Sequence, residues 1–397
     1  MLRGTPFHAR TSALCQGQNW RRWAGHIVAS SYDLTHEREY WAIRSASALI
    51  DVSPLYKYRV QGRDALRLID RIVTRDMTRC AVDQVMYTSW CDDRGMVLDD
   101  GTVARLGEGA FLITAADPNL RWLQENSVGM RVSIDDVSSS TAALAVQGPA
   151  ARSILGAATD GECAGLRFFR QARASIAGVP VRITRTGYTG DLGYEIWMDA
   201  GNALPVWDAL IASGTPWGLV PAGMLALDIA RIEAGLLLIS VDYISARHAL
   251  IESRKSSPFE LGLGWTVSLD KEFFVGKNAL RSQKEAGPDW RFLGLEVDWD
   301  GLEALYAEVG LPAEVPHQAW RTSVPVYAGG QQVGYATSGC WSPVLKKYIA
   351  LAHLRSEHAE LDTPVELEVT VEHRRRRAPA IVVRTPFFDP PRKRSMS

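Results

Sequence analysis

A glycine-rich segment near the middle of the chain, RTGYTGDLGYEI at 185–196, carries residue types that could bind a ligand. Its glycines, beginning with Gly187 and Gly190, recur at every third position, and glycine lets a backbone turn tightly or approach a ligand closely. Glu195 follows inside an apolar run, where a half-buried strand would begin. A buried carboxylate needs a donor partner, and a ring presenting N–H groups would satisfy it. The spacing alone nevertheless favours an ordinary turn with Glu195 in solvent, since glycine-rich turns are common.

Further short motifs lie on both sides of this segment: GMVLDD at 95–100, AVQGP at 145–149, RIEAG at 231–235, LGWTV at 263–267, FVGK at 274–277 and SGCWSP at 338–343. Together with the glycine-rich segment, they resemble motifs of the glycine cleavage T-protein (aminomethyltransferase) family, in the same order from about Asp51 to about Leu354. One short motif would be weak support, whereas several in order are strong. The chain is therefore identified as a member of this family from its sequence.

The resemblance implies the transfer of a methylene or methyl group from a donor to N5 of tetrahydrofolate. Asp99 matches the essential aspartate of the family, as the first acid of the pair Asp99-Asp100. Near N5 it would accept a proton and stabilise developing positive charge. Adjacent acids on an extended strand point to opposite faces, so we expect Asp100 to be solvated or to cap a turn. Without the resemblance, the two acids before Gly101 would indicate no more than a turn.

The resemblance also assigns the residues that would hold the pterin. Glu195 would bind the edge of the ring, because a carboxylate offers two acceptors to an amidine-like pair of N–H groups. Tyr188 would line the same cavity with a flat face and a hydroxyl group. Gly187 and Gly190 would let the backbone approach the cofactor. No metal ligands are expected, because no cysteine or histidine cluster has the required spacing.

Two further residues are candidate folate contacts with a structural alternative. Arg231 would meet a carboxylate, either that of the folate tail or that of the substrate, but it could equally pair with Asp228 within one helix. Trp265 is a candidate for stacking on the aromatic groups of folate, although a lone aromatic residue in an apolar run is more often part of the core. Glu233 lies off the helical face of Arg231 and is expected to be structural.

The segments expected on the donor side depart from the family pattern. Pro54 stands where the family has a histidine, and Ala115-Ala116-Asp117 lacks the family's asparagine. This asymmetry favours a changed carbon donor. The partner would then be either a lipoyl carrier protein, as in glycine cleavage, or a small molecule that an O-, S- or N-demethylase converts while producing methyltetrahydrofolate. A third possibility is a non-catalytic folate-binding protein like the iron–sulfur assembly relatives, but 271–277 lacks their reactive cysteine.

Composition limits the class of protein. The chain has 397 residues, of which 46% are hydrophobic and 22% charged, an ordinary globular balance. A formal net charge of -1 provides no field for binding nucleic acid. The longest apolar run, at 236–239, is too short to span a membrane, and no signal core begins the chain. Five scattered cysteines fit reduced thiols, so we expect a cytoplasmic protein.

The elements that must position these residues indicate an α+β, multi-domain T-protein-like fold. We expect a folate-binding body of two interleaved subdomains at 1–285, mixed α/β in content, and a C-terminal β-barrel domain at 286–397. Alternation predicts a strand at 56–60, and short apolar runs predict strands at 111–114 and 142–146. The strands at 179–183 and 194–198 suggest a hairpin whose turn is the glycine-rich segment. Helical spacing predicts helices after Gly62, from Pro205 and from Pro221 to about Ala234.

Three regions carry weaker signals. Residues before Trp41 are expected to form an irregular arm. The segment 300–320 interrupts the strand pattern of the second domain and holds a short helix, with a functional or interfacial role left open. The basic runs at 374–377 and 392–394 are expected to be a solvated strand end and a frayed tail, with a contact to phosphate or polyglutamate as the alternative.

Overall fold

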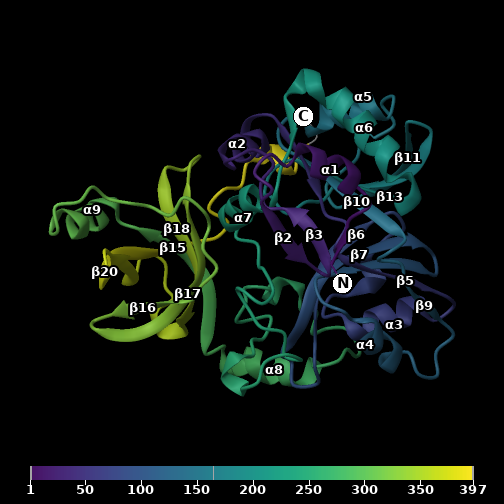
Figure 1. Cartoon of the computed structure of the whole chain (residues 1–397). Helices are drawn as coiled ribbons and strands as arrows, with labels where there is room; N and C mark the ends of the chain where they lie inside the picture. The colour runs from purple at the N-terminus through teal and green to yellow at the C-terminus, as the bar shows by residue number, and fades with distance from the viewer. Residues whose placement is uncertain (1, 164, 396–397) are drawn as a thin grey trace.

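The computed structural model describes residues 2–163 and 165–395, which form a body of sheets and helices beside a closed barrel (Figure 1). The first body sheet has the order β11 (Gln171–Ile176), β12 (Val179–Thr184), β13 (Gly193–Asp199), β10 (Thr141–Gln147), β4 (Ser47–Asp51) and β14 (Leu219–Pro221). The second has the order β6 (Val85–Cys91), β7 (Val97–Gly107), β8 (Ala110–Ala115), β5 (Tyr56–Gln61) and β9 (Ser133–Asp136). The chain builds the whole second sheet between β4 and β10, so the two sheets are interleaved in sequence.

The barrel at the left of Figure 1 closes in the order β15 (Trp290–Val297), β18 (Lys347–Arg355), β17 (Gln331–Ser342), β16 (Val324–Ala328), β19 (Pro364–Val371) and β20 (Arg374–Val383). This confirms the α+β fold with a C-terminal barrel. The segment 300–320 contains the expected short helix, α9 (Trp299–Ala307), which packs on β20. The other helices after the first two are α3 (Ala65–Ile72), α4 (Leu120–Asn126), α5 (Ala151–Ala158), α6 (Ala203–Gly214), α7 (Met224–Glu233) and α8 (Lys277–Ala286).

Burial explains the central elements. β10 is apolar on both faces and buried from Ala142 to Gln147, as a strand covered on two sides must be. Helix α7 is buried at every residue from Leu225 to Glu233, because it packs against α2 of the body and against β17 and β18 of the barrel. It therefore connects the two halves of the molecule. No helix that the structure describes combines the length and apolar character of a membrane span.

The glycine-rich segment is the turn of the predicted hairpin, because β12 and β13 pair antiparallel with Thr184 opposite Glu195. Gly190 has a φ of +74°, and a Cβ there would lie 2.5 Å from the Cβ of Ala234. A side chain at Gly187 would meet the amide group of Gln147. The amide of Gln147 donates to the carbonyls of Thr186 and Tyr194 and accepts from the hydroxyl of Thr189, so the glycines allow the turn to close onto this side chain.

Two expectations were wrong. The residues before Trp41 are not irregular: they form a small sheet in the order β1 (Arg3–Gly4), β3 (His26–Ala29) and β2 (Trp20–Trp23), with helix α1 (His8–Leu14) and the start of α2 (Glu37–Ser45). The run 392–394 is not a frayed tail, because Arg392 forms an ion pair with Asp191 of the body. The other basic run lies on β20 and is mostly exposed, as expected.

Candidate active site

The two adjacent acids on β7 face opposite sides of the second sheet, as the alternation of a strand requires. Asp99 is opposite Trp90 and fully buried on the side of α3 and α4, whereas Asp100 is opposite Ser89 and faces the first sheet. Asp100 is neither solvated nor a cap: its carboxylate accepts hydrogen bonds from the hydroxyls of Tyr87, at 2.6 Å, and Tyr243, at 2.5 Å. The acid that meets other site residues is therefore Asp100.

Three tyrosines surround this carboxylate. Tyr87 lies on β6, Tyr243 in the loop after α7, and Tyr188 in the glycine-rich turn, where its hydroxyl donates to the carbonyl of Leu237. Burial raises the pKa of Asp100, and the nearby Asp242 adds to this, while the hydroxyls of Tyr243 and Tyr87 partly oppose it. A raised pKa is one of the properties by which a carboxyl group can serve in proton transfer.

Asp99 has a complete set of partners of its own. Its oxygens accept from the backbone N–H groups of Asp100 and Asp117 and from the side-chain amide of Asn119, at 2.8–3.0 Å. Asn119 also accepts from the indole of Trp90, which ties the carboxylate into the core. Burial raises the pKa of Asp99 well above its usual range, and the neighbouring Asp100 adds to the effect. The catalytic role expected of Asp99 stays a prediction, and its surroundings are those of a structural group.

Glu195 lies on β13 and faces the second sheet. Its Oε2 accepts from the hydroxyl of Thr186 at 2.6 Å and from that of Thr184 at 3.4 Å. Burial raises its pKa, and these hydroxyls partly oppose the shift. Glu195 lines a narrow cavity together with Thr102 and Thr114 of the second sheet. Thr102 lies two residues beyond Asp100 on the same face of β7, so both acids border the space between the sheets.

Arg231 on α7 is fully buried, and its closer carboxylate partner is Asp242 rather than Asp228, the in-helix partner expected from the sequence. Its Nη1 donates to Asp242 at 2.5 Å, whereas its Nε lies 3.7 Å from Asp228. Asp228 is instead bound by Arg21, at 3.0 Å, and Arg321, at 2.5 Å. The Nη2 of Arg231 is buried without a hydrogen-bond partner among the described residues. A buried guanidinium N–H without a partner is costly and could donate to the carboxylate of a ligand.

The barrel contributes to this arrangement. Asp242, the partner of Arg231, accepts at its other oxygen from the hydroxyls of Thr337 and Ser338 on β17, at 2.6 and 2.8 Å. The side chain of Asp242 is therefore fixed from both domains, and it fixes Arg231 in turn. Glu233, two residues further along α7, binds Tyr40, Arg44 and Ser342 and is structural, as expected.

Trp265 is not a core residue. It lies in the short helix Gly264–Thr266, its side chain is 62% exposed, and its ring is nearly parallel to that of Tyr87, with centroids 6.0 Å apart. The guanidinium of Arg75 lies 5.2 Å from the Trp265 ring. An exposed indole beside the tyrosines of the site offers an aromatic face to a ligand.

Sequence reasoning missed several residues of this cluster. Tyr87 could have been found from alternation, because it shares a face of its strand with Ser89. Asp242 and Tyr243 lie in a loop with no periodicity, so only the folded chain brings them to Asp100 and Arg231. Asn119, which donates to Asp99, follows the segment where the family's asparagine was found to be absent.

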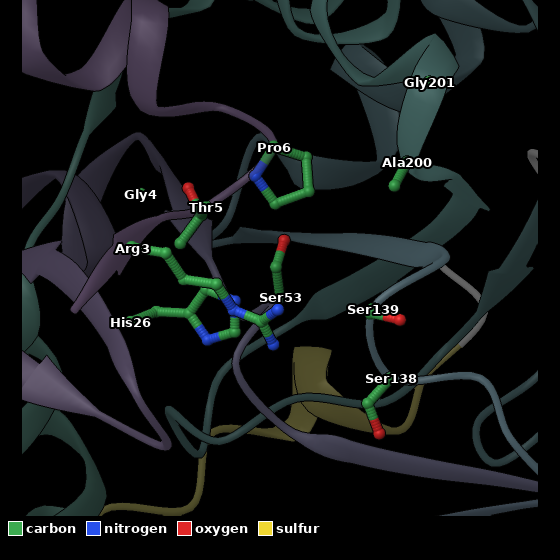
Figure 2. A pocket seen from close by; sticks show the side chains of 10 residues that line it. All are labelled: Arg3, Gly4, Thr5, Pro6, His26, Ser53, Ser138, Ser139, Ala200 and Gly201. Atoms are coloured by element: carbon green, nitrogen blue, oxygen red, sulfur yellow. The ribbon is translucent and has the colours of Figure 1, made fainter. Parts of the chain in front are cut away.

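A separate cavity of about 410 Å³ opens between the N-terminal sheet and two loops of the body (Figure 2). Arg3, His26 and Ser53 line it, and the side chain of Arg3 extends beside the His26 ring. It contains none of the candidate site residues, which lie instead between the two body sheets and around α7.

Comparisons with known proteins agree with the motifs. The chain matches a family model described as the GCVT N-terminal domain over residues 8–271, and one described as the glycine cleavage T-protein C-terminal barrel domain over residues 308–389. An aminomethyltransferase of Halalkalibacterium halodurans is 37% identical over 371 residues, covering 92% of each chain. One of Moorella thermoacetica is 35% identical over 396 residues, covering 99% of each.

A solved structure shows the same fold. The crystal structure of glycine cleavage system aminomethyltransferase T from Bartonella henselae matches with a TM-score of 0.83 at 23% identity, over 98% of this chain and 99% of that one. Together with the aminomethyltransferases that match almost the whole chain, the fold defines an enzyme of the transferase class whose general chemistry is folate-dependent one-carbon transfer. The chain belongs to the glycine cleavage T-protein family.

Proposed function

We propose that this enzyme transfers a one-carbon unit, as methylene or methyl, from a donor to N5 of tetrahydrofolate. One observation carries the proposal: Asp100, held by two tyrosine hydroxyls, lies on the face of β7 that also carries Thr102, and Thr102 lines the cavity between the body sheets together with Glu195, which is held by two threonine hydroxyls. Two half-buried carboxylates with raised pKa values are typical of a site that binds N–H groups and moves a proton. The names of the relatives, which are aminomethyltransferases, support the same chemistry.

The residues present suit a folate. The carboxylate of Glu195 can accept from the paired N–H groups of the pterin edge. The buried Nη2 of Arg231 has no hydrogen-bond partner within residues 2–163 and 165–395 and can donate to a carboxylate, such as that of the folate tail. The exposed ring of Trp265 and the half-buried ring of Tyr188 offer apolar faces for the aromatic parts of the ligand.

Tetrahydrofolate, when bound, supplies the nucleophilic nitrogen N5. The chain supplies the proton acceptor, for which Asp100 is placed better than Asp99 because its oxygens face the site. The hydroxyls of Tyr87 and Tyr243 orient that carboxylate and stabilise its charged form. The charge of Asp100 would also stabilise positive charge that develops beside it.

Two donors remain open. Aminomethyl transfer from a lipoyl carrier protein is the reaction to which the names of the relatives point. A small-molecule demethylase, which would produce methyltetrahydrofolate, is favoured by Pro54 at the expected histidine position and by the unpartnered Nη2 of Arg231, which could instead bind a carboxylate-bearing donor. Folate binding without catalysis is the third possibility.

The donor assay separates these possibilities. We expect the purified enzyme, given tetrahydrofolate and an aminomethyl-loaded lipoyl carrier protein, to form methylenetetrahydrofolate and to release ammonia and the carrier with its free dihydrolipoyl thiol, with the folate product identified by chromatography. Product as methyltetrahydrofolate from small O-, S- or N-methyl compounds, with none from the carrier, would instead establish the demethylase. Tetrahydrofolate binding without turnover of any donor would leave the non-catalytic protein, and absence of binding would remove all three.

The pH profile should respond to the tyrosines. Because the Tyr243 hydroxyl lowers the pKa of Asp100, Tyr243→Phe should raise that pKa and move the acid limb of kcat/KM upward by roughly half to one pH unit. A matched control is Tyr327→Phe, which removes a tyrosine hydroxyl from Glu368 on the barrel surface. An acid limb that stays in place in Tyr243→Phe would exclude an ionised Asp100 from the rate-limiting proton transfer.

A further inference from the structure

The C-terminal segment returns from the barrel to the body. After β20 the chain, yellow in Figure 1, crosses from the barrel to the body, passes α2 and α7, and reaches α5, where Arg152 binds the carbonyl of Ser395. The backbone N–H of Phe388 donates to the carbonyl of Glu233 at 2.8 Å, and the guanidinium of Arg44 lies 4.4 Å from the Phe388 ring centroid. The carbonyl of Phe388 lies beside Gly190, where a Cβ would be 3.5 Å away. The segment therefore lies directly on the glycine-rich turn.

Arg392 forms the tightest contact with that turn. Its Nε and Nη2 donate to the two oxygens of Asp191 at 2.7 and 2.8 Å, which is the bidentate geometry of a strong charge-assisted pair. The side chain of Asp191 is fully buried. The other cation near it, Arg44, lies 3.6 Å from its Oδ2 and already binds Glu233. Asp191 thus relies on Arg392 for its direct hydrogen bonds from a cation.

Arginines of the body also bind the backbone of this segment. The fully buried Arg185, at the start of the glycine-rich segment, donates through Nη2 to the carbonyls of Arg392, Lys393 and Ser395, at 3.3, 3.2 and 2.6 Å. Arg152 donates to the carbonyl of Ser395 at 3.0 Å. These carbonyls belong to the short helix Pro391–Lys393 and the residues after it, where backbone acceptors lack internal partners. The position of Arg392 is therefore itself fixed.

The position of Asp191 in the turn links the C-terminal segment to the candidate folate site. It lies between Tyr188 and Glu195, the two residues of the turn and strand that border the candidate folate site. Gln147 holds the turn from the sheet side through Thr186 and Thr189, and Arg392 holds it from the opposite side through Asp191. The turn is therefore held by side chains from two separate parts of the chain, the sheet and the C-terminal segment.

We propose that Arg392 is a positioning residue for folate binding: the C-terminal segment completes the folate site by holding the turn that carries Tyr188 and leads to Glu195. This inference rests on the proposed function. Arg392 does not border the space between the sheets, so it acts through Asp191 and the backbone of the turn. Its loss should weaken tetrahydrofolate binding more than it lowers the turnover of the bound complex.

The test compares Arg392→Gln with Arg394→Gln in the full chain. Arg394 is the control, because it pairs with Asp389 inside the same segment and its side chain is 53% exposed. We expect Arg392→Gln to raise the dissociation constant and KM for tetrahydrofolate about tenfold, with kcat within about twofold, because a misplaced binding group costs affinity first. Arg392→Lys keeps the positive charge but cannot form the bidentate pair. Its dissociation constant for tetrahydrofolate should lie between those of the unmodified enzyme and of Arg392→Gln. Arg394→Gln should match the unmodified enzyme.

A second readout does not depend on folate. Hydrogen exchange of the peptide that covers 186–193 should be faster in Arg392→Gln than in Arg394→Gln and in the unmodified enzyme. Faster exchange together with weaker folate binding supports the proposal. A lower unfolding temperature with unchanged exchange in the turn and unchanged folate affinity would overturn the proposal. Arg392 would then only stabilise the packing of the C-terminal segment on the body.

Failure of the proposed function has a different signature. If the unmodified enzyme does not bind tetrahydrofolate, the proposed function falls, while the exchange measurement still decides whether Arg392 holds the turn. If Arg392→Gln does not fold, Arg392→Lys carries the same comparison, because it retains a cation beside the buried Asp191.

Discussion

Asp100→Asn should lower kcat by about 10²–10⁴-fold while tetrahydrofolate still binds, because the substitution removes the proton acceptor and keeps the shape of the side chain. Asparagine can still accept one of the two tyrosine hydrogen bonds at its carbonyl oxygen. Its uncharged amide can neither take up a proton nor stabilise positive charge. The measurement is single-turnover product formation, with calorimetry to show that the cofactor is bound.

Asp99→Asn is the comparison that decides between the two acids. The oxygens of Asp99 accept from two backbone N–H groups and from the amide of Asn119. In Asp99→Asn, the new side-chain NH₂ group would face at least one of these N–H donors and lose that hydrogen bond. We expect this variant to lose about 1–3 kcal/mol of stability, measured by unfolding, with a smaller effect on kcat than Asp100→Asn. The reverse order, with turnover lost in Asp99→Asn and retained in Asp100→Asn, would restore the assignment made from the motif.

The glycine-rich turn shows what the sequence allowed us to predict. Alternating residues on both sides of it define a hairpin, and glycines at fixed spacing define its turn, so both signals are local and agree. The structure pairs Thr184 with Glu195 accordingly. The order of short motifs identified the family in the same way, since each motif is a continuous stretch of chain.

The orientation of Asp99 and Asp100 is a feature that local sequence patterns could not predict. Alternation states that Asp99 and Asp100 face opposite sides, but not which side carries the site. Which acid faces which side is decided by the pairing of β7 with β6 and by the helices that cover the other face of the sheet. The register of that pairing shifts between Trp90 and Cys91. A one-residue ambiguity in register exchanges the two faces of a strand, so a motif match alone could not choose between adjacent acids.

Non-local contacts account for the other misses. Tyr243 comes to Asp100 from a loop 143 positions away, and Arg392 comes to Asp191 from 201 positions away. The composition of the run 392–394 is that of a solvated tail, and nothing in its own residues indicates a buried carboxylate elsewhere. The N-terminal strands are only two to four residues long, too short for periodicity to emerge.

Glu195→Ala should weaken tetrahydrofolate binding by about 30-fold or more without unfolding the enzyme, because it removes both acceptors for the pterin edge from a site shielded from water. Burial raises the pKa of Glu195, so its folded pKa lies above its unfolded one. Such a carboxylate costs stability at neutral pH, and the cost disappears as the pH falls through the two pKa values. A residue kept at a cost to folding is a candidate for function.

Because the charge of Glu195 costs stability at neutral pH, an experiment can separate its effect on binding from its effect on folding. Glu195→Gln preserves the volume of the side chain and relieves the buried charge, so its unfolding temperature at neutral pH should equal or exceed that of the unmodified enzyme. Its affinity for tetrahydrofolate should nevertheless fall, because an amide presents one acceptor where the carboxylate presents two. Calorimetric titration of both variants, each checked by thermal unfolding, measures the two effects independently. Binding of normal strength in Glu195→Ala would refute the pterin-edge assignment and leave Glu195 as a partner of Thr184 and Thr186 alone.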